Sequence, residues 1–373
     1  MKRFKNLFDQ LITDYNIDRA ITNSAKGKHN RDDVQRVFNN RVKYIKKIKN
    51  AICKNNFVKS IHKGIKIYDG SSRKERIIIV PTYLYEQIVH HAVVQVLQPV
   101  ILRGMYVFSC GSVPGRGIHY GKRYIEKFIR EHKDKQDIKY CLKFDIKHFY
   151  QNVNTDLLMK KFEHIIKDKN MLTIIDSILN SNKAEFEDEI IDMGLPIGFY
   201  TSQWFSNFFL QDFDHFVKEK LHIKCYVRYV DDVILFGSNK KQLHNDFLEI
   251  RKFLESEKLT IKENWQIFKF DYTNKKGVRT GRPLDFMGFK FYRDKTTIRK
   301  NIMLKTSRKA RKINKKDKIS WFDAAQFLSY LGWYSHADCH GSYEKHIKPF
   351  ASPAQCKHII SKHTKKIFNK DKE

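Results

Sequence analysis

The segment from Tyr226 to Gly237 places two adjacent aspartates, Asp231 and Asp232, between two apolar runs. Asp is depleted in strands, and neighbouring like charges repel each other. The pair is therefore unsuited to the middle of a strand, but it suits the tip of a tight hairpin that presents carboxylates to a cation. A surface turn that contains two aspartates by chance is the alternative interpretation of this segment alone.

A third aspartate follows another apolar run. Lys139 to Asp145 has the pattern of a strand, and the aromatic pair Phe149-Tyr150 comes shortly after it. Mg²⁺ prefers oxygen ligands, usually one or two carboxylates plus substrate phosphates. Carboxylates from two neighbouring strands can hold two such ions, one to activate a primer 3′-hydroxyl and one to neutralise the leaving pyrophosphate. The segments together predict a metal-dependent nucleotidyl-transfer site.

The charge of the chain makes a nucleic acid its expected partner. The 373 residues include 72 Lys and Arg against 41 Asp and Glu, a formal net charge of +31 at pH 7. A compact chain of that charge repels itself unless a polyanion lies nearby. A protein that is kept soluble by its lysines is the alternative. No apolar run reaches the ~20 residues that a spanning helix needs, so no membrane partner is expected.

The six cysteines are scattered along the chain and form no CxxC pair. We interpret them as reduced thiols of a cytoplasmic protein. Zinc ligation by Cys339, His340, Cys356 and His358 is a minor alternative, because this spacing is not a common one for zinc.

Local patterns predict a mixture of helices and short strands. Residues 1–70 are basic and largely helical in pattern. The apolar run Ile77–Val80 is typical of a strand that Pro81 ends. Helical periodicity then runs from Tyr85 to about Gln98, and Pro99 is expected to break that helix.

A loop with two glycines, Gly194 to Gly198, precedes another predicted helix. Thr201 or Ser202 is expected to cap the N-terminus of this helix, which carries phenylalanines on one face. A loop that opens a helix suits contact with a nucleotide, although this motif alone is weak.

Taken together, these segments resemble the palm of reverse transcriptases. Phe144 to Tyr150 resembles the first palm motif, Gly194 to Asn207 the second, and Tyr229 to Asp232 the catalytic hairpin. Leu284 to Phe289 resembles the later hairpin that grips the primer, and Arg73 to Pro81 resembles the fingers. The resemblance covers roughly residues 70–335, and the order and spacing of the motifs make it highly specific.

The resemblance implies an α+β right-hand polymerase fold, with fingers, a palm that contains an antiparallel sheet, and a helical thumb. The implied division is a basic helical N-terminal extension (1–70), fingers (71–138), a palm (139–300) with a helical fingers insertion at about 154–193, and a basic helical thumb with a C-terminal tail (301–373).

The implied activity is RNA-directed DNA synthesis with two Mg²⁺ ions, for which Mn²⁺ can substitute. Asp145, Asp231 and Asp232 are the implied catalytic residues and metal ligands, and the Ile146 carbonyl is a further ligand. The implied nucleotide-binding residues are Arg73, Lys74, Arg76, Tyr150 and Gln203. Tyr150 would lie under the incoming sugar and exclude a 2′-hydroxyl, and the basic residues would clamp the triphosphate. A core aromatic and solvated surface residues are the respective alternatives.

Template and primer contacts are expected from Arg116, Gly198, Met287, Gly288, Arg308, Lys309 and Lys312. The basic segments 1–64 and 304–318 would line a phosphate-binding channel. An RNA–DNA hybrid is recognised by its shape and backbone, which fits many lysines and few obvious base readers. Trp321 and Trp333 are expected in the core rather than as stacking platforms.

The second motif narrows the resemblance to bacterial enzymes. Ile197-Gly198 followed by Thr201-Ser202-Gln203 is similar to reverse transcriptases of diversity-generating retroelements and of the unknown groups linked to phage defence. Many relatives carry a lysine near the position of Trp265, where it acts as a general acid toward pyrophosphate. In this chain Lys262 or Lys269 would have to replace it, or no side chain does.

The first hypothesis is therefore a reverse transcriptase that copies a dedicated, structured noncoding RNA in antiphage defence. A mutagenic reverse transcriptase of a diversity-generating retroelement is the second, and a nucleic-acid-binding protein without activity is the third, which the intact aspartates argue against. Expected partners are the noncoding RNA template, a DNA primer or product, and deoxynucleoside triphosphates. A second reverse transcriptase, an effector protein, an oligomer, and untemplated or protein-primed synthesis all stay open.

Overall fold

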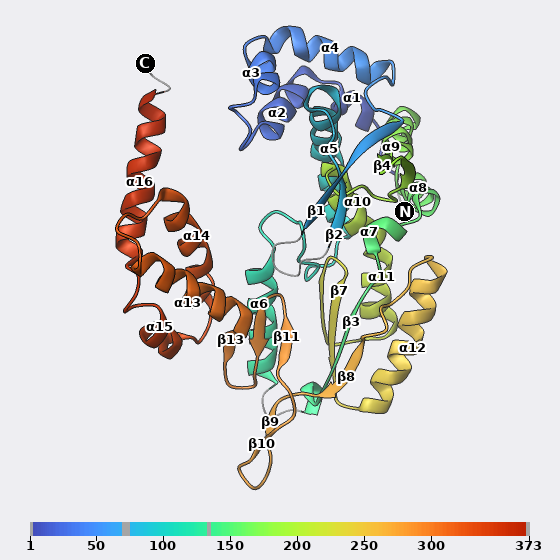
Figure 1. Cartoon of the computed structure of the whole chain (residues 1–373). Coiled ribbons are helices and arrows are strands. Elements are labelled where there is room, and N and C mark those ends of the chain that lie inside the picture. Colours follow the sequence, from blue (N-terminus) through green and yellow to red (C-terminus); the bar gives the residue numbers. More distant parts are fainter. Residues whose placement is uncertain (1–2, 69–74, 133–135, 371–373) are drawn as a thin grey trace. The chain divides into compact units, whose positions relative to one another are not determined.

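The computed structural model describes residues 3–68, 75–132 and 136–370 and contains two compact units, whose elements are labelled in Figure 1. The first unit comprises Met1–Gly115, Lys143–Leu235 and Lys241–Gln266. The second comprises Arg116–Leu142, Phe236–Lys240 and Ile267–Glu373. Each unit is therefore assembled from interleaved segments and not from one consecutive stretch.

The N-terminal part of the first unit is a layer of helices. It consists of α1 (Leu7–Leu11), α2 (Asp14–Ser24), α3 (Asp32–Phe38), α4 (Arg41–Cys53), a kinked segment (Tyr83–Gln87) in which Leu84 and Tyr85 have non-helical backbone angles, and α5 (Ile88–Gly104). α2 packs along α5, where the Asn16 amide donates to the Ala92 carbonyl at 3.2 Å. Pro99 lies inside α5, so the expected break there is wrong. Packing of α5 against α2 and α10 outweighs the loss of one backbone hydrogen bond at the proline.

A four-stranded sheet in the order β2–β1–β4–β5 belongs to the same unit. Its strands are β1 (Ile61–Tyr68), β2 (Glu75–Ile79), β4 (Lys183–Phe186) and β5 (Glu189–Asp192). β1 pairs antiparallel with β2 and parallel with β4. β2 confirms the strand expected before Pro81. β1 corrects the expectation that residues 1–70 are largely helical, because β-branched residues at Ile61, Ile65 and Ile67 favour a strand there.

The remaining elements of the first unit are mainly helices. They are α7 (Phe149–Asn152), α8 (Thr155–Ile165), α9 (Lys169–Asn180), α10 (Tyr200–Phe209), α11 (Gln211–His215), a π-helical turn (Phe216–Lys220), β6 (Cys225–Tyr229) and α12 (Lys240–Ser256). Phe144 packs edge-on against Phe213 and Phe247, with ring centroids 6.5 and 6.1 Å away. Apolar residues of α11 and α12 thus cover the strand that leads to Asp145.

β3 (Tyr140–Asp145), β7 (Asp232–Gly237) and β8 (Gln266–Lys269) complete a second four-stranded sheet in the order β6–β7–β3–β8.

α10 begins after Phe199, and no side chain caps it, so the capping role expected for Thr201 or Ser202 is wrong. The Thr201 hydroxyl is instead within 2.8 Å of Nδ1 of the buried His90. A buried partner on α5 therefore takes the hydroxyl that the local pattern assigned to the helix end.

The second unit combines small hairpins with helices. Its elements are α6 (Ile118–Glu131), β9 (Tyr272–Thr273), β10 (Arg279–Thr280), β11 (Leu284–Phe286), β12 (Phe289–Phe291), β13 (Thr296–Ile298), α13 (Lys300–Asn314), α14 (Trp321–Leu331), α15 (His340–His346) and α16 (Pro353–Lys370), with 3₁₀ turns at Gln136–Ile138 and Tyr334–His336. β12 pairs antiparallel with both β11 and β13, and α14 packs along α16. No helix in the described part of the chain is both long and apolar enough to cross a membrane.

Candidate active site

Asp231 and Asp232 lie at the turn that joins β6 to β7, so the hairpin expected from the sequence is confirmed. Val230 precedes them with a φ of 58°, a left-handed conformation that is rare and strained for a β-branched residue. Gly111 makes room for it, because a Cβ at that position would lie 2.3 Å from Val230 Cγ2. Packing therefore holds the tip of the hairpin in a conformation that its own residues disfavour.

A buried ion pair stabilises this hairpin. Nε and Nη2 of Arg228 donate to the two carboxylate oxygens of Asp214 at 2.7 and 2.6 Å, and both side chains are 0% exposed. Nη1 of Arg228 donates to the Val230 carbonyl at 3.0 Å and to Asn207 Oδ1 at 3.2 Å. A bidentate guanidinium–carboxylate pair is directionally specific, so Arg228 links the strained turn to α10 and α11.

Asp145 ends β3 beside the same turn. The backbone N–H of Ile146 donates to the Asp231 carbonyl at 3.2 Å, and the backbone N–H of Lys262 donates to the Asp145 carbonyl at 2.9 Å. The Lys262 ammonium donates to Asp145 Oδ1 at 2.5 Å. The two carboxylate-bearing segments that the sequence singled out therefore meet, and a lysine from the segment after α12 joins them.

The electrostatics of the site are those of carboxylates gathered in a partly buried place. Burial, followed by the charge of Asp145, raises the pKa of Asp231 to about 6, whereas Lys262 acts in the opposite direction. A carboxylate that is penalised in this way gains free energy from any cation placed beside it. Lys262 supplies one such charge to Asp145.

The donor set fits a divalent ion that completes its coordination with substrate. In the segments that the structure describes, no three His, Cys, Asp or Glu side chains already converge as a ligand set. Mg²⁺ usually takes only one or two protein carboxylates and fills its other positions with phosphate oxygens and water. Asp145 and Asp231 would provide such carboxylates, and the raised pKa of Asp231 means that a cation beside it would stabilise its charged form.

A pocket of about 430 Å³ in the first unit brings together four of the predicted residues: Arg76, Tyr150, Gly198 and Gln203. Burial raises the pKa of the Tyr150 hydroxyl, and the charge of Asp231 adds to that effect, so the tyrosine lies within electrostatic range of the hairpin. Ser206 Oγ is 3.5 Å from the Tyr150 hydroxyl. An aromatic floor, an arginine and an amide around one pocket suit a nucleotide.

Two further residues of this pocket escaped the sequence analysis. Lys28 and His91 line it, and the His91 ring stacks on Tyr200 with centroids 3.9 Å apart and an interplanar angle of 9°. Burial, followed by the charge of Lys28, lowers the pKa of His91 to about 4. The many basic residues of the N-terminal extension could have indicated that Lys28 contacts an anionic ligand. No local pattern distinguishes His91 from any other helical histidine.

Gly198 has a structural reason to be glycine. Its φ is 122°, and a Cβ there would lie 1.9 Å from the Ile79 carbonyl oxygen. The Ile79 N–H donates to the Ile197 carbonyl at 2.9 Å, so the loop before α10 is bonded to β2. Arg73 and Lys74, which were predicted to bind the triphosphate, lie outside the described residues.

The predicted template and primer contacts, except Gly198, all fall in the second unit. Met287 and Gly288 form the turn between β11 and β12 with φ values of 50° and 85°. A Cβ on Gly288 would lie 2.6 Å from the Trp333 ring, so the hairpin rests on that tryptophan. Arg116 is half-buried and precedes α6.

The three basic residues predicted on α13 differ in exposure. Arg308 and Lys312 are exposed, but Lys309 is only 8% exposed and donates to Asp323 at 2.7 Å. The expectation that Lys309 contacts phosphate is therefore wrong, since its charge is neutralised within the unit. Asp323 also accepts from Lys316, so α13 and α14 are tied together by this buried carboxylate.

Trp265 is packed and not poised for chemistry. Its ring stacks on Phe247 of α12 with centroids 4.1 Å apart and meets His244 edge-on at 5.9 Å. Of the two lysines considered as substitutes, Lys262 contacts Asp145, whereas Lys269 donates to the Tyr272 hydroxyl at 2.6 Å. The geometry therefore favours Lys262 as the cationic residue of the site.

Comparison with known proteins identifies the architecture. Residues 61–291 match the family described as "Reverse transcriptase (RNA-dependent DNA polymerase)". Over 151 residues the chain is 22% identical to Protein YkfC of Escherichia coli (strain K12), an alignment that covers 40% of this chain and 39% of that protein. The chain thus spans well under half of this curated relative.

Solved structures of telomerase are also similar to the chain. Apo telomerase from Candida tropicalis has a TM-score of 0.51 at 16% identity, over 73% of this chain and 53% of that one. Telomerase from Candida albicans in complex with a fragment of telomeric RNA has a TM-score of 0.46 at 14% identity, over 76% and 54%. The first of these likenesses shows that the chain has the right-hand polymerase fold expected from its motifs.

Proposed function

The chain belongs to the reverse transcriptase family, and from this premise we propose that it synthesises DNA on an RNA template at Asp145, Asp231 and Asp232. The observation that carries the proposal is the meeting of the β3 end with the β6–β7 turn, together with the raised pKa of Asp231. We assign residues 71–138 to the fingers, 139–300 to the palm with its insertion at about 154–193, and 301–373 to the thumb, after the extension 1–70.

Asp145 and Asp231 would hold the divalent ions, with the Ile146 carbonyl and Asp232 as further ligands. When bound, Mg²⁺ supplies the positive charge that activates the primer hydroxyl and neutralises the leaving pyrophosphate. The protein contributes placement, because Arg228 and Gly111 hold the turn before Asp231 and Asp232 in its strained conformation. Nucleotidyl transfer depends on such positioning and on charge, with little covalent work from the protein.

Residues of the pocket would bind and select the incoming deoxynucleotide. Arg76 and Lys28 offer charge for the triphosphate, and Gln203 offers an amide to the sugar or the templating base. Tyr150 would lie against the sugar and exclude a 2′-hydroxyl by its bulk. Lys262, which contacts Asp145, would be the residue that gives a proton to the leaving pyrophosphate.

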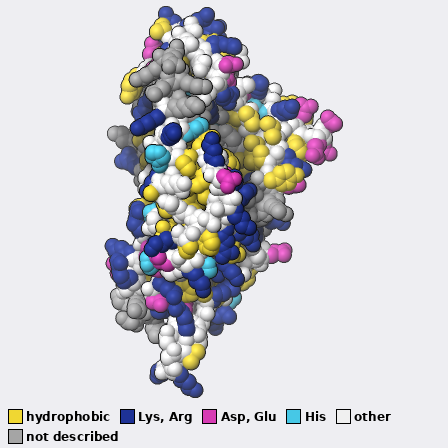
Figure 2. All heavy atoms as spheres, turned by 60° about the vertical axis from the view of Figure 1, so that its left-hand side comes forward, with side chains coloured by type: hydrophobic (Ala, Val, Ile, Leu, Met, Phe, Trp, Pro, Cys, Tyr) yellow, Lys and Arg dark blue, Asp and Glu magenta, His cyan; other side chains and the backbone are white. Residues whose placement is uncertain are grey.

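We further propose that the template is a dedicated, structured noncoding RNA and that the enzyme acts in antiphage defence. The motif from Ile197 to Gln203 supports this assignment through its resemblance to defence-associated enzymes. The net charge of +31 supports binding of a long polyanion. Lys and Arg side chains are spread over the face shown in Figure 2 and are more widespread there than acidic side chains.

The test is to sequence the nucleic acid that co-purifies with the wild-type chain and with an Asp231→Ala, Asp232→Ala variant. One discrete RNA is expected with both proteins, and DNA complementary to it only with the wild type. An Asp9→Ala, Asp156→Ala variant removes two exposed carboxylates of the same unit and serves as the control. Equal amounts of complementary DNA with the wild type and with the Asp231→Ala, Asp232→Ala variant would refute the catalytic assignment.

The defence role has a separate readout. Cells that express the wild-type chain with its flanking DNA should reduce phage plating efficiency at least tenfold relative to cells with the Asp231→Ala, Asp232→Ala variant. Equal plating on both strains, with complementary DNA still produced, would leave the polymerase activity standing and remove the defence role.

A further inference from the structure

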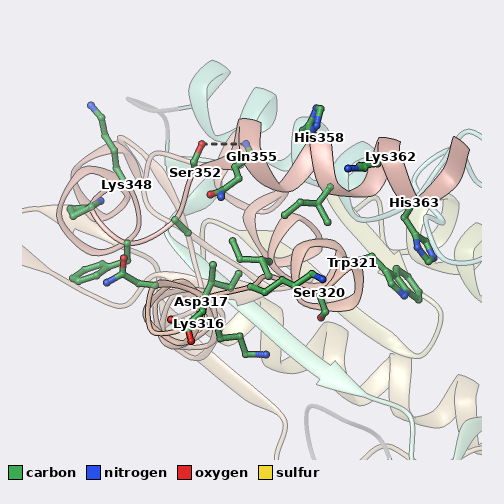
Figure 3. A pocket seen from close by; sticks show the side chains of 18 residues that line it. Lys316, Asp317, Ser320, Trp321, Lys348, Ser352, Gln355, His358, Lys362 and His363 are labelled. Carbon is green, nitrogen blue, oxygen red and sulfur yellow. Dashed lines mark hydrogen bonds between the residues drawn. The ribbon is translucent and has the colours of Figure 1, made fainter. Parts of the chain in front are cut away.

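The second unit contains a hollow that the proposed polymerase chemistry does not use. Its volume is about 980 Å³, and it is lined by α13, the loop 316–320, α14, the segment before α16, and α16 itself (Figure 3). All of its lining residues belong to the second unit. A cavity of this size is large enough for a ligand bigger than one nucleotide base.

The charge of the hollow is strongly positive. Four lysines line it, at positions 316, 318, 348 and 362, against the single carboxylate of Asp317. Lys316 is engaged by Asp323 and Lys348 by Glu344. Lys318 and Lys362 are exposed and form no ion pair within the described residues. Two cations are therefore available to an anionic ligand, one from the loop between α13 and α14 and one from α16.

One end of the hollow is aromatic. Trp321 is 48% exposed, which corrects the expectation that it lies in the core. Its ring stacks on His363 of α16 with centroids 4.7 Å apart and an interplanar angle of 8°, as the close-up in Figure 3 shows. Phe322 beside it is 60% exposed. The Trp321 and Phe322 rings are neighbours, with centroids 6.1 Å apart, and contiguous exposed apolar surface of this kind marks interaction sites.

This combination of charge and aromatic surface matches one chemistry. Bases of an unpaired strand stack on aromatic side chains while lysines track its phosphates. In a duplex the bases are stacked on one another and their faces are not accessible, so a duplex would contact only the lysines. We propose that the hollow binds an unpaired stretch of nucleic acid, with one base on Trp321 and phosphates beside Lys318 and Lys362. The inference goes beyond polymerisation and rests on the proposed function only in taking nucleic acid as the ligand.

Tryptophan fluorescence reports on this hollow directly. The full-length chain is titrated without divalent ions with a 12-nucleotide oligouridylate, the matching oligothymidylate, a blunt DNA duplex, and heparin as a polyanion without bases. Both single strands, or one of them, are expected to quench the emission. Trp321→Phe should still bind, because phenylalanine keeps an aromatic face, but that part of the quenching should disappear.

Paired variants then separate stacking from charge. Trp321→Ala should weaken oligonucleotide binding about tenfold, as loss of one base–aromatic stack does. Lys318→Ala with Lys362→Ala should weaken the binding that quenches Trp321 and reduce the slope of log K against log salt by about 1.4, at about 0.7 for each phosphate contact. Lys345→Ala with Lys357→Ala removes two exposed lysines of α15 and α16 outside the hollow and should leave the quenching unchanged.

The inference is overturned if duplex or heparin quenches as well as a single strand, if Trp321→Phe keeps the full quenching, or if the control pair weakens it as much as Lys318 and Lys362 do. Tighter binding of oligouridylate would identify RNA as the ligand, and tighter binding of oligothymidylate would identify DNA. The Asp231→Ala, Asp232→Ala variant should quench like the wild type, so the failure of catalysis and the failure of this site are distinguishable.

Discussion

Asp214→Ala should destabilise the first unit and displace the hairpin that carries Asp231 and Asp232. The carboxylate of Asp214 accepts two short bonds from Arg228 and one from the Tyr226 hydroxyl at 2.6 Å, all in a fully buried place. Alanine leaves the guanidinium buried and without its counter-charge. The remaining acceptors of Arg228 are the neutral oxygens of Asn207 and Val230.

The expected magnitude follows from the burial of the pair. Removal of one partner of a buried ion pair costs about 3–5 kcal/mol, out of a total stability of about 5–15 kcal/mol for a typical protein. For a unit of roughly 150–250 residues this corresponds to a fall in Tm of about 10 °C. Differential scanning calorimetry of the wild type and the variant measures the fall.

A double variant, Asp214→Leu with Arg228→Met, separates stability from activity. It removes both charges at once, and replacement of a buried pair by apolar side chains is often close to neutral for stability. Most of the lost Tm should therefore return. Polymerase activity should not return, because the Val230 carbonyl loses the Arg228 bond that holds the strained turn. A Tm of Asp214→Ala within 2 °C of the wild type, or full activity of the double variant, would refute the reasoning.

Three further outcomes are expected. Tyr150→Val should lower the preference for deoxynucleotides over ribonucleotides at least tenfold in kcat/KM, whereas Tyr150→Phe should keep it; an unchanged ratio would mean that the tyrosine does not touch the sugar. Burial opposes the ionisation of Glu86, but bonds from His62 and Thr82 hold its pKa at about 2 against an ordinary 4.5. Because the folded pKa is the lower one, about 3 kcal/mol of stability is present above pH 4.5 and is lost as the pH falls toward 2, and a Glu86→Gln variant should show a flatter acid-unfolding curve between those values. Lys262→Ala should lower the catalytic rate and also the Mg²⁺ concentration at half-maximal rate, because the lysine competes for the Asp145 carboxylate; a higher Mg²⁺ requirement would argue against that competition.

The sequence could predict the features that depend on short stretches of chain. Two aspartates between apolar runs favour a turn, and Asp231 lies in the turn between β6 and β7 while Asp232 begins β7. The apolar run that ends at Asp145 is β3, and the run before Pro81 is β2. The alternation of apolar and polar residues and the preferences of turn residues depend on near neighbours in the sequence. These elements could therefore be predicted without knowledge of the fold.

The partners of individual side chains could not be predicted from local patterns, because they come from distant segments of the chain. Lys309 has the same local surroundings as Arg308 and Lys312, yet Asp323 of the next helix draws it into the interior. Pro99 looks like a helix break until the packing of α5 is known. A residue's burial and the charge beside it are properties of the packed unit, and a local pattern does not contain them.

The sequence by itself determined the family, the order of its motifs and the carboxylates proposed to carry its chemistry, since these depend on residue type and spacing. Only the tertiary structure decided that His91 and Lys28 share a pocket with Tyr150, that burial and Asp145 raise the pKa of Asp231, and that Trp321 is exposed beside lysines. Each of these results depends on desolvation and on charges brought together from far along the chain, which exist only once the chain has packed.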